Sequence, residues 1–136
     1  MVYLAAACRS GFTPVRQIAE ALGISAPFLS KVFQQLVQAG LAESYCGPSG
    51  GVRVAQPPET IMLLRIVVAI DGEGLFRDCV LGLPGCGHAR PCPVHDAWVA
   101  RRADLQQMFA ARTLAEAAAS VHDDARRLAA DTSGDA

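Results

Sequence analysis

The sequence predicts a mainly α-helical fold, in which a winged helix-turn-helix domain is followed by a long dimerisation helix. Three observations lead to this prediction. Two short stretches with apolar residues at helical spacing are joined by a tight turn at Gly23. Two short strand-like runs follow them, separated by a turn rich in glycine. Finally, a long helical stretch comes after a loop that contains three cysteines.

Size and composition limit the function classes. The chain has 136 residues, of which 51% are hydrophobic and 18% charged, with a net charge of -1. It is therefore expected to fold as a single domain, and a multidomain enzyme is excluded. The longest apolar run, 61–70, is interrupted by Arg65 and is far shorter than the roughly 20 residues of a membrane span. The start lacks the basic region of a secretory signal, so we expect a cytoplasmic protein without a membrane segment.

The first two complete helices are predicted from their caps and their apolar spacing. Residues 1–8 look like the end of an apolar helix. Thr13 is expected to cap the next helix, with Pro14 at its first position and Gly23 at its end. Ser25 is expected to cap the second helix, whose buried stripe would be Leu29, Val32, Phe33 and Leu36. At 100° per residue, the opposite face carries Pro27, Lys31, Gln34 and Gln38, with Ser30 and Gln35 at its margins.

After the second helix, the spacing of apolar residues changes from helical to strand-like. Residues 41–46 and 52–55 predict a hairpin around a Gly-rich turn, 47–51. We expect Thr60 to cap a buried helix, 61–70, and the following region to be a loop because of its glycines and prolines. A long helix is predicted from Pro93 to about Ala111, and Thr113 is expected to cap a last, Ala-rich helix. The long helix carries an interrupted apolar stripe of Val94, Trp98, Leu105, Met108 and Phe109. From Trp98 onward this stripe predicts a dimer contact combined with core packing.

The order helix, turn, helix, hairpin is typical of a winged DNA-binding domain. The second helix would enter the major groove, where glutamine and lysine side chains meet base edges and phosphates. The Gly-rich wing would approach the duplex closely, and Arg53 would reach a phosphate or the minor groove. The candidate DNA-binding residues are Ser25, Pro27, Ser30, Lys31, Gln34, Gln35, Ser49, Gly50 and Arg53. The alternative is a helical hairpin used for protein contacts.

The cysteines predict a second kind of site. The chain has five of them, an odd number that argues against a disulfide scaffold and for metal ligation or redox chemistry. Cys79, Cys86 and Cys92 come from one loop, so their thiolates could converge on a soft metal ion or an iron–sulfur cluster. With Pro93 at the first helical position, the Cys92 sulfur would lie at a helix N-terminus that favours the thiolate. His95, one helical turn further on, is a candidate fourth ligand, and His88 is a second one.

Other uses of these residues remain open. Three cysteines and one histidine would also suit a structural zinc site. The cysteines could act as thiol sensors without any metal. A nucleophilic pair of Cys92 and His95 lacks a third residue and identifiable oxyanion donors, so we do not expect an enzyme.

Four segments together resemble the Rrf2 family of winged-helix transcriptional regulators, in particular its IscR- and NsrR-like members. The segments are 17–25, 27–36, 47–55 and 92–98. The resemblance covers about residues 1–118 and implies a homodimeric regulator, usually a repressor, that binds a double-stranded DNA operator. In this dimer, the long helix of one protomer would pair with the same helix of its partner. The resemblance also implies an iron–sulfur cluster, [2Fe–2S] or [4Fe–4S], held by Cys79, Cys86 and Cys92, with His95 as the fourth ligand. Such a cluster would sense iron–sulfur status, redox state or nitric oxide.

On this resemblance the chain divides into four parts. They are a winged helix-turn-helix domain (1–72), a cysteine-bearing cluster loop (73–92), a dimerisation helix with a C-terminal helix (93–130) and a frayed tail (131–136). The chain begins inside the family's first helix, so the family's basic opening segment would be missing, and we expect either an upstream start codon or weaker DNA binding. The alternative function is a zinc-stabilised or thiol-based winged-helix module that acts through protein interactions.

Overall fold

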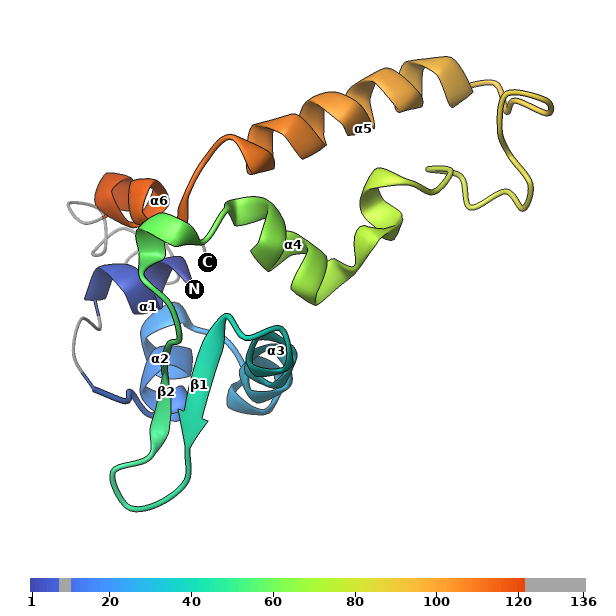
Figure 1. Ribbon diagram of the computed structural model, residues 1–136. Helices are drawn as coiled ribbons and strands as arrows, with labels where there is room; N and C mark the ends of the chain where they lie inside the picture. Colours follow the sequence, from blue (N-terminus) through green and yellow to red (C-terminus); the bar gives the residue numbers. More distant parts are fainter. Residues whose placement is uncertain (8–10, 122–136) are drawn as a thin grey trace, which may run out of the picture.

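The computed structural model describes residues 1–7 and 11–121 and shows a helical body from which an arm projects (Figure 1). The prediction of a mainly helical fold with a small two-stranded wing is confirmed. The predicted tail, Cys8 and the part of the C-terminal helix after Val121 lie outside the described residues. The helices of the body are α1 (Val2–Ala7), α2 (Val15–Leu22), α3 (Ala26–Gln38), the 3₁₀ helix η1 (Pro58–Thr60) and α6 (Leu114–Val121).

Helix α2 begins one residue later than the sequence suggested, and the prediction that Thr13 caps it is wrong. Pro14 occupies the cap position and makes no side-chain cap bond. Thr13 instead pairs its backbone with Val52 of the wing, through two hydrogen bonds of 2.9 Å. The pairing buries Thr13 and fastens the start of α2 to the hairpin. Gly23 ends the helix in the left-handed conformation, with a φ of 64°.

Helix α3 matches its predicted pattern. The hydroxyl of Ser25 accepts a hydrogen bond from the backbone N–H of Phe28 at 3.5 Å, which confirms the N-cap. Leu29, Phe33 and Leu36 are buried in the core, and Val32 is half-buried beside them. The polar face is thereby left toward solvent.

The wing consists of β1 (Ala42–Tyr45) and β2 (Gly51–Val54), paired antiparallel with Ala42 opposite Val54 and Glu43 opposite Arg53. Ala42 and Val52 point into the core. Gly51 has a φ of 156°, and a Cβ at this position would lie 2.2 Å from the carbonyl oxygen of Thr13. A glycine is therefore required where the hairpin crosses the start of α2.

Arm and body meet at two places. Helix α4 (Leu63–Asp71) packs against α3, with Ile66, Ala69 and Ile70 lying against the core. The second contact is the pairing of residues 61–63 with 112–114 around a bridge between Met62 and Thr113, which we call the neck. The N–H of Leu63 donates to the carbonyl of Arg112 at 2.9 Å, and that of Leu114 donates to Ile61 at 2.7 Å. Ile61 and Leu114 are both fully buried. The prediction that Thr60 caps a helix starting at Ile61 is wrong, because Ile61 belongs to this pairing and the Thr60 hydroxyl donates to Pro57.

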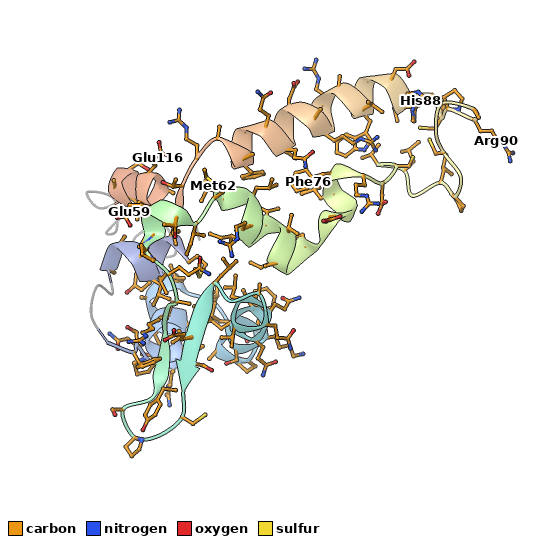
Figure 2. All side chains as sticks on the ribbon, viewed as in Figure 1. Glu59, Met62, Phe76, His88, Arg90 and Glu116 are labelled. Atoms are coloured by element: carbon orange, nitrogen blue, oxygen red, sulfur yellow. The ribbon has the colours of Figure 1, made fainter. Side chains whose placement is uncertain are left out.

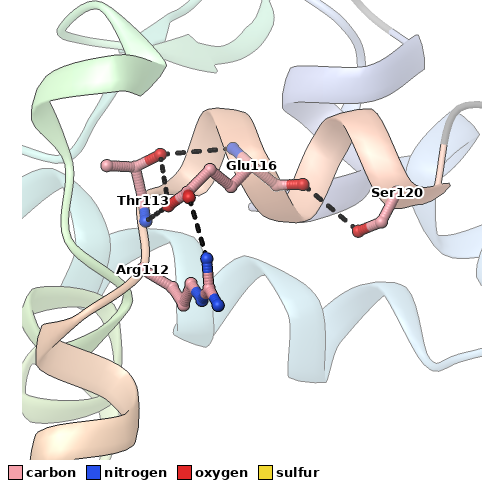
Figure 3. A network of polar contacts seen from close by, with 4 residues as sticks. All are labelled: Arg112, Thr113, Glu116 and Ser120. Atoms are coloured by element: carbon pink, nitrogen blue, oxygen red, sulfur yellow. Dashed lines mark hydrogen bonds and ion pairs between the residues drawn. The ribbon is translucent and has the colours of Figure 1, made fainter.

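Helix α6 starts at Leu114, within the neck, and has the predicted cap. The hydroxyl of Thr113 accepts from the N–H of Glu116 at 3.2 Å, and the Glu116 carboxylate accepts from the N–H of Thr113 at 2.7 Å (Figure 3). This reciprocal pair is a capping box, and Arg112 adds an ion pair of 3.2 Å to Glu116. The cap thus holds Arg112 and Thr113 of the neck in place as well as the start of α6.

The arm contains α4 (Leu63–Asp71), the 3₁₀ helix η2 (Glu73–Phe76) and α5 (His95–Ala110), with segment 77–94 at its outer end (Figure 1). The expectation that α4 is buried is wrong for a single chain, because none of its residues is fully buried. Phe76 packs edge-on against Phe109, with 6.5 Å between the ring centroids. None of the described helices is both long and apolar enough to cross a membrane.

Candidate metal centre and nucleic-acid interface

Cys79, Cys86 and Cys92 come together at the outer end of the arm. Their sulfur atoms all lie within 4.8 Å of one another, and those of Cys79 and Cys92 are 3.7 Å apart. All three thiols are free and partly buried. The structure therefore gathers three soft ligands from a segment of only fourteen residues, 79–92.

Both ends of this segment are tied to α5. The indole N–H of Trp98 donates to the carbonyl of Asp78 at 2.8 Å, and Arg102 donates to the carbonyl of Arg77. These contacts fix the backbone that leads into Cys79. At the other end, the carbonyl of Cys92 accepts from the N–H of His95 at 3.0 Å. A movement of the cysteines would therefore displace the first two turns of α5 through these hydrogen bonds.

His95 lies beside the three sulfurs but contacts only one of them. Its Nδ1 is 3.4 Å from the sulfur of Cys86, and in the described chain the mutually close group consists of sulfurs alone. His95 is 8% exposed, and its buried Nε2 has no hydrogen-bond partner among residues 1–7 and 11–121. His88 meets it edge-on, 5.3 Å between centroids, and Figure 2 shows His88 and Arg90 at the outer end of the arm. The assignment of His95 as fourth ligand stays a prediction.

The environment of the thiols differs from the expectation at Cys92. Helix α5 begins at His95, with Val94 as its N-cap, so Pro93 is outside the helix and the predicted position of Cys92 at a helix N-terminus is wrong. The thiolate of Cys79 is favoured instead. A hydrogen bond from the Leu83 backbone, assisted by one from Leu81 and by the other two thiols, lowers the pKa of Cys79 to about 7. The pKa of Cys86 is raised, because burial and the neighbouring thiols outweigh a backbone hydrogen bond from Cys92.

The donor set fits both an iron–sulfur cluster and a single ion. Thiolates are the ligands of iron–sulfur clusters and are equally suited to zinc. Bonds of about 2.3 Å at a tetrahedral ion place two sulfurs about 3.8 Å apart, which agrees with the 3.7 Å between Cys79 and Cys92. In an iron–sulfur cluster, two thiolates on the same iron have a similar spacing, whereas thiolates on separate irons lie further apart. Segment 79–92 contains turns but no helix or strand, so its backbone can open to that spacing.

A second candidate site lies on α3, at the other end of the molecule. The side chains of Pro27, Lys31 and Gln34 are exposed, and Ser30 is half-buried. Gln35 is exposed on the side toward α4, where its amide donates to the carbonyl of Ile70 at 3.5 Å. Ser25 is occupied as the helix cap. Between α3 and the wing runs a groove of about 430 Å³, whose polar lining includes Ser30, Gln34 and Tyr45.

Of the predicted wing residues, Ser49 and Gly50 lie in the turn, and Arg53 lies within β2. Ser49 is exposed, and the N–H of Gly50 closes the turn on the carbonyl of Gly47 at 2.9 Å. The Arg53 guanidinium is already engaged: it pairs with Glu43 at 2.7 Å and lies over the ring of Phe12, 4.7 Å from its centroid. Arg53 therefore has to share its charge between Glu43 and any phosphate that approaches.

Sequence reasoning missed two exposed aromatic residues on these elements. Phe28, in the first turn of α3, is 61% exposed, and Tyr45, at the end of β1, is 57% exposed. Phe28 lies outside the arc directly opposite the buried stripe, so helical counting did not select it. Tyr45 lies where the strand runs into the wing turn, and it stacks on Phe12 with 5.6 Å between centroids. The solvent-exposed end of a strand was the only signal for it.

Comparisons with known proteins agree on the class of this chain. Residues 1–120 match a family described as "Rrf2: Iron-dependent Transcriptional regulator". A putative HTH-type transcriptional regulator of Neisseria meningitidis is 34% identical over 98 residues, which is 72% of this chain and 66% of the relative. The HTH-type transcriptional regulator IscR of Aliivibrio salmonicida is 33% identical over 98 residues, 72% of this chain and 58% of that protein. The chain thus spans less than two thirds of these relatives' length.

Solved structures show the same fold. The global cysteine regulator CymR of B. subtilis superimposes with a TM-score of 0.70 at 24% identity, covering 88% of this chain and 87% of that chain. IscR of T. potens gives a TM-score of 0.68 at 22% identity, with 90% of this chain and 81% of that chain covered. At these identities the likeness establishes the winged-helix architecture alone.

Proposed function

Because the chain belongs to the Rrf2 family, a family of transcriptional regulators and not of enzymes, we propose that it is a cytoplasmic, homodimeric repressor whose operator binding depends on a metal cofactor. The observation that carries this proposal is the convergence of Cys79, Cys86 and Cys92 within 4.8 Å. We assign to them an iron–sulfur cluster, with His95 as the candidate fourth ligand. When bound, such a cluster supplies iron that reacts with oxidants and nitric oxide.

DNA binding is assigned to α3 and the wing. Lys31 and Gln34 project from the exposed face of α3, where lysine suits guanine or phosphate and glutamine suits adenine. Ser49, Gly50 and Arg53 would follow the duplex on the wing side. In a two-fold dimer, two such surfaces would meet half-sites about 34 Å apart.

The apolar surface of the arm supports the dimer. Met108, on α5, is 54% exposed, and Trp98, Leu105 and Phe109 are only half-buried in the single chain. Helix α4 carries almost only apolar residues and none of them is fully buried. A second copy of the chain, packed along α5, would cover this surface.

The same arm offers a physical route from the cysteines to the DNA. Trp98 and Arg102 join α5 to the backbone before Cys79, and α5 leads into the neck at Arg112. A rearrangement of segment 79–92 would shift α5, and with it the orientation of the body on the dimer. The spacing of the two α3 helices would then no longer match both half-sites, and affinity would fall.

Anaerobic purification tests the cofactor assignment. Protein handled without oxygen should absorb visible light and contain both iron and acid-labile sulfide. Metal-free and sulfide-free protein that still responds to oxidants would overturn the assignment.

A salt titration tests DNA binding. The logarithm of the affinity should fall linearly with the logarithm of salt concentration. Lys31→Ala should weaken binding and reduce the slope by about one if Lys31 meets a phosphate, whereas Lys31→Arg should preserve the slope. An unchanged slope in the alanine variant would remove this role from Lys31.

The three close thiols also support a second candidate, a zinc-stabilised winged-helix module acting through protein interactions. The 3.7 Å between Cys79 and Cys92 suits one tetrahedral ion. Such protein would be colourless and contain zinc without sulfide, and its binding to DNA would be absent or insensitive to salt.

A further inference from the structure

We propose that Phe28 contacts the methyl group of a thymine in each half-site and thereby helps to determine which base sequence this chain binds. The inference rests on the proposed function, because it assumes that α3 lies in the major groove. It adds an aromatic contact to an interface whose assigned base and phosphate contacts are polar or charged.

Exposure first draws attention to this residue. At 61%, Phe28 is the most exposed large apolar side chain in the part of the chain that the structure describes. Single exposed apolar residues are common on protein surfaces, so this number alone would not assign a role. Ile24 adds to it, since this residue in the turn before α3 is 39% exposed. The start of α3 therefore presents apolar surface to solvent, in a helix whose other exposed side chains are mainly polar.

The position of Phe28 supplies the second argument. It lies in the first turn of α3, where its backbone N–H is held by the hydroxyl of Ser25. In helix-turn-helix proteins, the N-terminal residues of the second helix are those that contact base edges. Phe28 also shares a face of the helix with the exposed Gln35, away from the side that borders the groove toward the wing. It would therefore meet the duplex beside Pro27 and Lys31, at the border of the polar contact face.

Chemistry then restricts the target. A phenyl ring has no hydrogen-bond donor and no acceptor that could satisfy a phosphate or a polar base edge. The C5 methyl of thymine is the apolar group that the bases display in the major groove. Contact between the ring and this methyl removes apolar surface of both groups from water, which is favourable in proportion to the area covered.

Replacement of thymine by deoxyuridine tests the contact, because it removes the methyl and keeps the base pairing. Duplexes that bind the full chain are first selected from a random pool, and each thymine is then replaced in turn. For the wild-type chain, deoxyuridine at one thymine in each half-site should weaken binding about fourfold per methyl lost. Phe28→Ala should weaken binding to the thymine duplex by a similar factor and should no longer distinguish the two duplexes.

Matched controls separate this contact from general effects. Phe28→Leu, which keeps an apolar side chain, should retain part of the discrimination. Leu75→Ala removes an apolar side chain of the arm that is 38% exposed, and should leave the discrimination intact. Circular dichroism of each variant checks that the helices are preserved.

Two results would count against the proposals in different ways. If no thymine shows the methyl effect, or if Phe28→Ala distinguishes thymine from deoxyuridine as the wild type does, the contact proposed here is wrong while DNA binding stands. If the selection yields no duplex that binds with a salt-dependent affinity, the proposed function itself fails.

Discussion

The cysteines of this chain have different surroundings, and these lead to different expectations for substitution. Cys92 lies 3.7 Å from the sulfur of Cys79, whereas Cys46 is exposed in the wing. We expect Cys92→Ala to abolish incorporation of the metal cofactor and leave the helices in place, because Cys92 is partly buried in a turn and not in the core. Iron, sulfide and visible absorption would be measured in anaerobic protein. Cys46→Ala is the matched control and should retain them all; absorption that persists in Cys92→Ala would contradict the ligand assignment.

Glu43 is expected to restrain DNA binding by the wing. Its carboxylate pairs with Arg53 at 2.7 Å, and about half of each side chain is exposed, at 46% and 49%. Exposed pairs of this kind are weak, so a phosphate can compete for the guanidinium.

Glu43→Gln should therefore raise the affinity for duplex DNA, about two- to fivefold at low salt, because it releases Arg53 and removes a charge that repels phosphate. Titration of a labelled duplex at several salt concentrations measures this effect. Combined with Arg53→Ala, the same substitution should lose most of its benefit. An unchanged or lower affinity in Glu43→Gln would show that Arg53 does not meet DNA.

At the scale of elements, the cap of α6 is the contact most accessible to a stability measurement. Thr113→Ala should lower the free energy of unfolding by about 1 kcal/mol, because it removes the hydroxyl that caps α6. Thr113→Ser keeps that oxygen and should be close to wild type. Urea denaturation followed by circular dichroism gives both values, and equal midpoints for the alanine and serine variants would rule out the cap as a stabilising contact.

The partner of Thr113 in this cap adds a dependence on pH. The backbone N–H of Thr113, followed by Arg112, lowers the pKa of the Glu116 carboxyl below its ordinary value. Because the pKa is lowered in the folded chain, the ionised carboxylate stabilises the fold at any pH above the ordinary pKa of a glutamate. This contribution is lost as the pH falls through the lowered pKa. Glu116→Gln should therefore be less stable than wild type at neutral pH and match it in acid.

Four predicted helix caps show what local sequence can and cannot reveal. Ser25 and Thr113 were predicted correctly, because a cap hydroxyl bonds to a group three residues away and needs nothing else. Thr13 and Thr60 have the same local pattern and were predicted wrongly. In both places an extended backbone pairs with a distant part of the chain: Thr13 pairs with Val52, and Ile61 with Leu114. Such tertiary pairing leaves no mark on the sequence around the threonine.

In the candidate sites, too, local features were predictable and features that depend on tertiary structure were not. Cysteine spacing within one loop was enough to predict that the three thiols converge. The exposed face of α3 likewise followed from helical periodicity. The contact between His95 and Cys86, and the pairing of Arg53 with Glu43, depend on the start of α5 and on the hairpin register. The hairpin register is set by packing in the folded chain, so nothing in the local sequence indicated that Arg53 is engaged with Glu43.

At the scale of the whole molecule, the arm separates the two candidate sites. Segment 77–94, which carries the three cysteines, forms its outer end, and α3 and the wing lie in the body, with the neck and the contact of α4 with α3 between them (Figure 1). Coupling between the sites therefore depends on how α5 is held. In the proposed dimer, a second α5 holds it, because a single arm leaves much apolar surface uncovered.

Oligomeric state tests this part of the account. The wild-type chain should sediment as a dimer. Met108→Glu should raise the dissociation constant of the dimer about tenfold or more, because a carboxylate would replace an apolar side chain in the interface. Gln106→Glu changes an exposed residue about 200° away on α5 and should remain dimeric. A wild-type chain that sediments as a monomer at micromolar concentration would contradict the proposed arrangement.

The most direct test of coupling is the affinity of one preparation for one selected duplex, measured anaerobically before and after a chelator has removed the metal. If the cysteines at the end of the arm control the DNA-reading surface, the affinity should fall about 5- to 150-fold on removal, the usual range for coupling between two sites. Sedimentation of both samples would show whether the dimer is retained. Equal affinities for the loaded and the stripped protein would contradict the account.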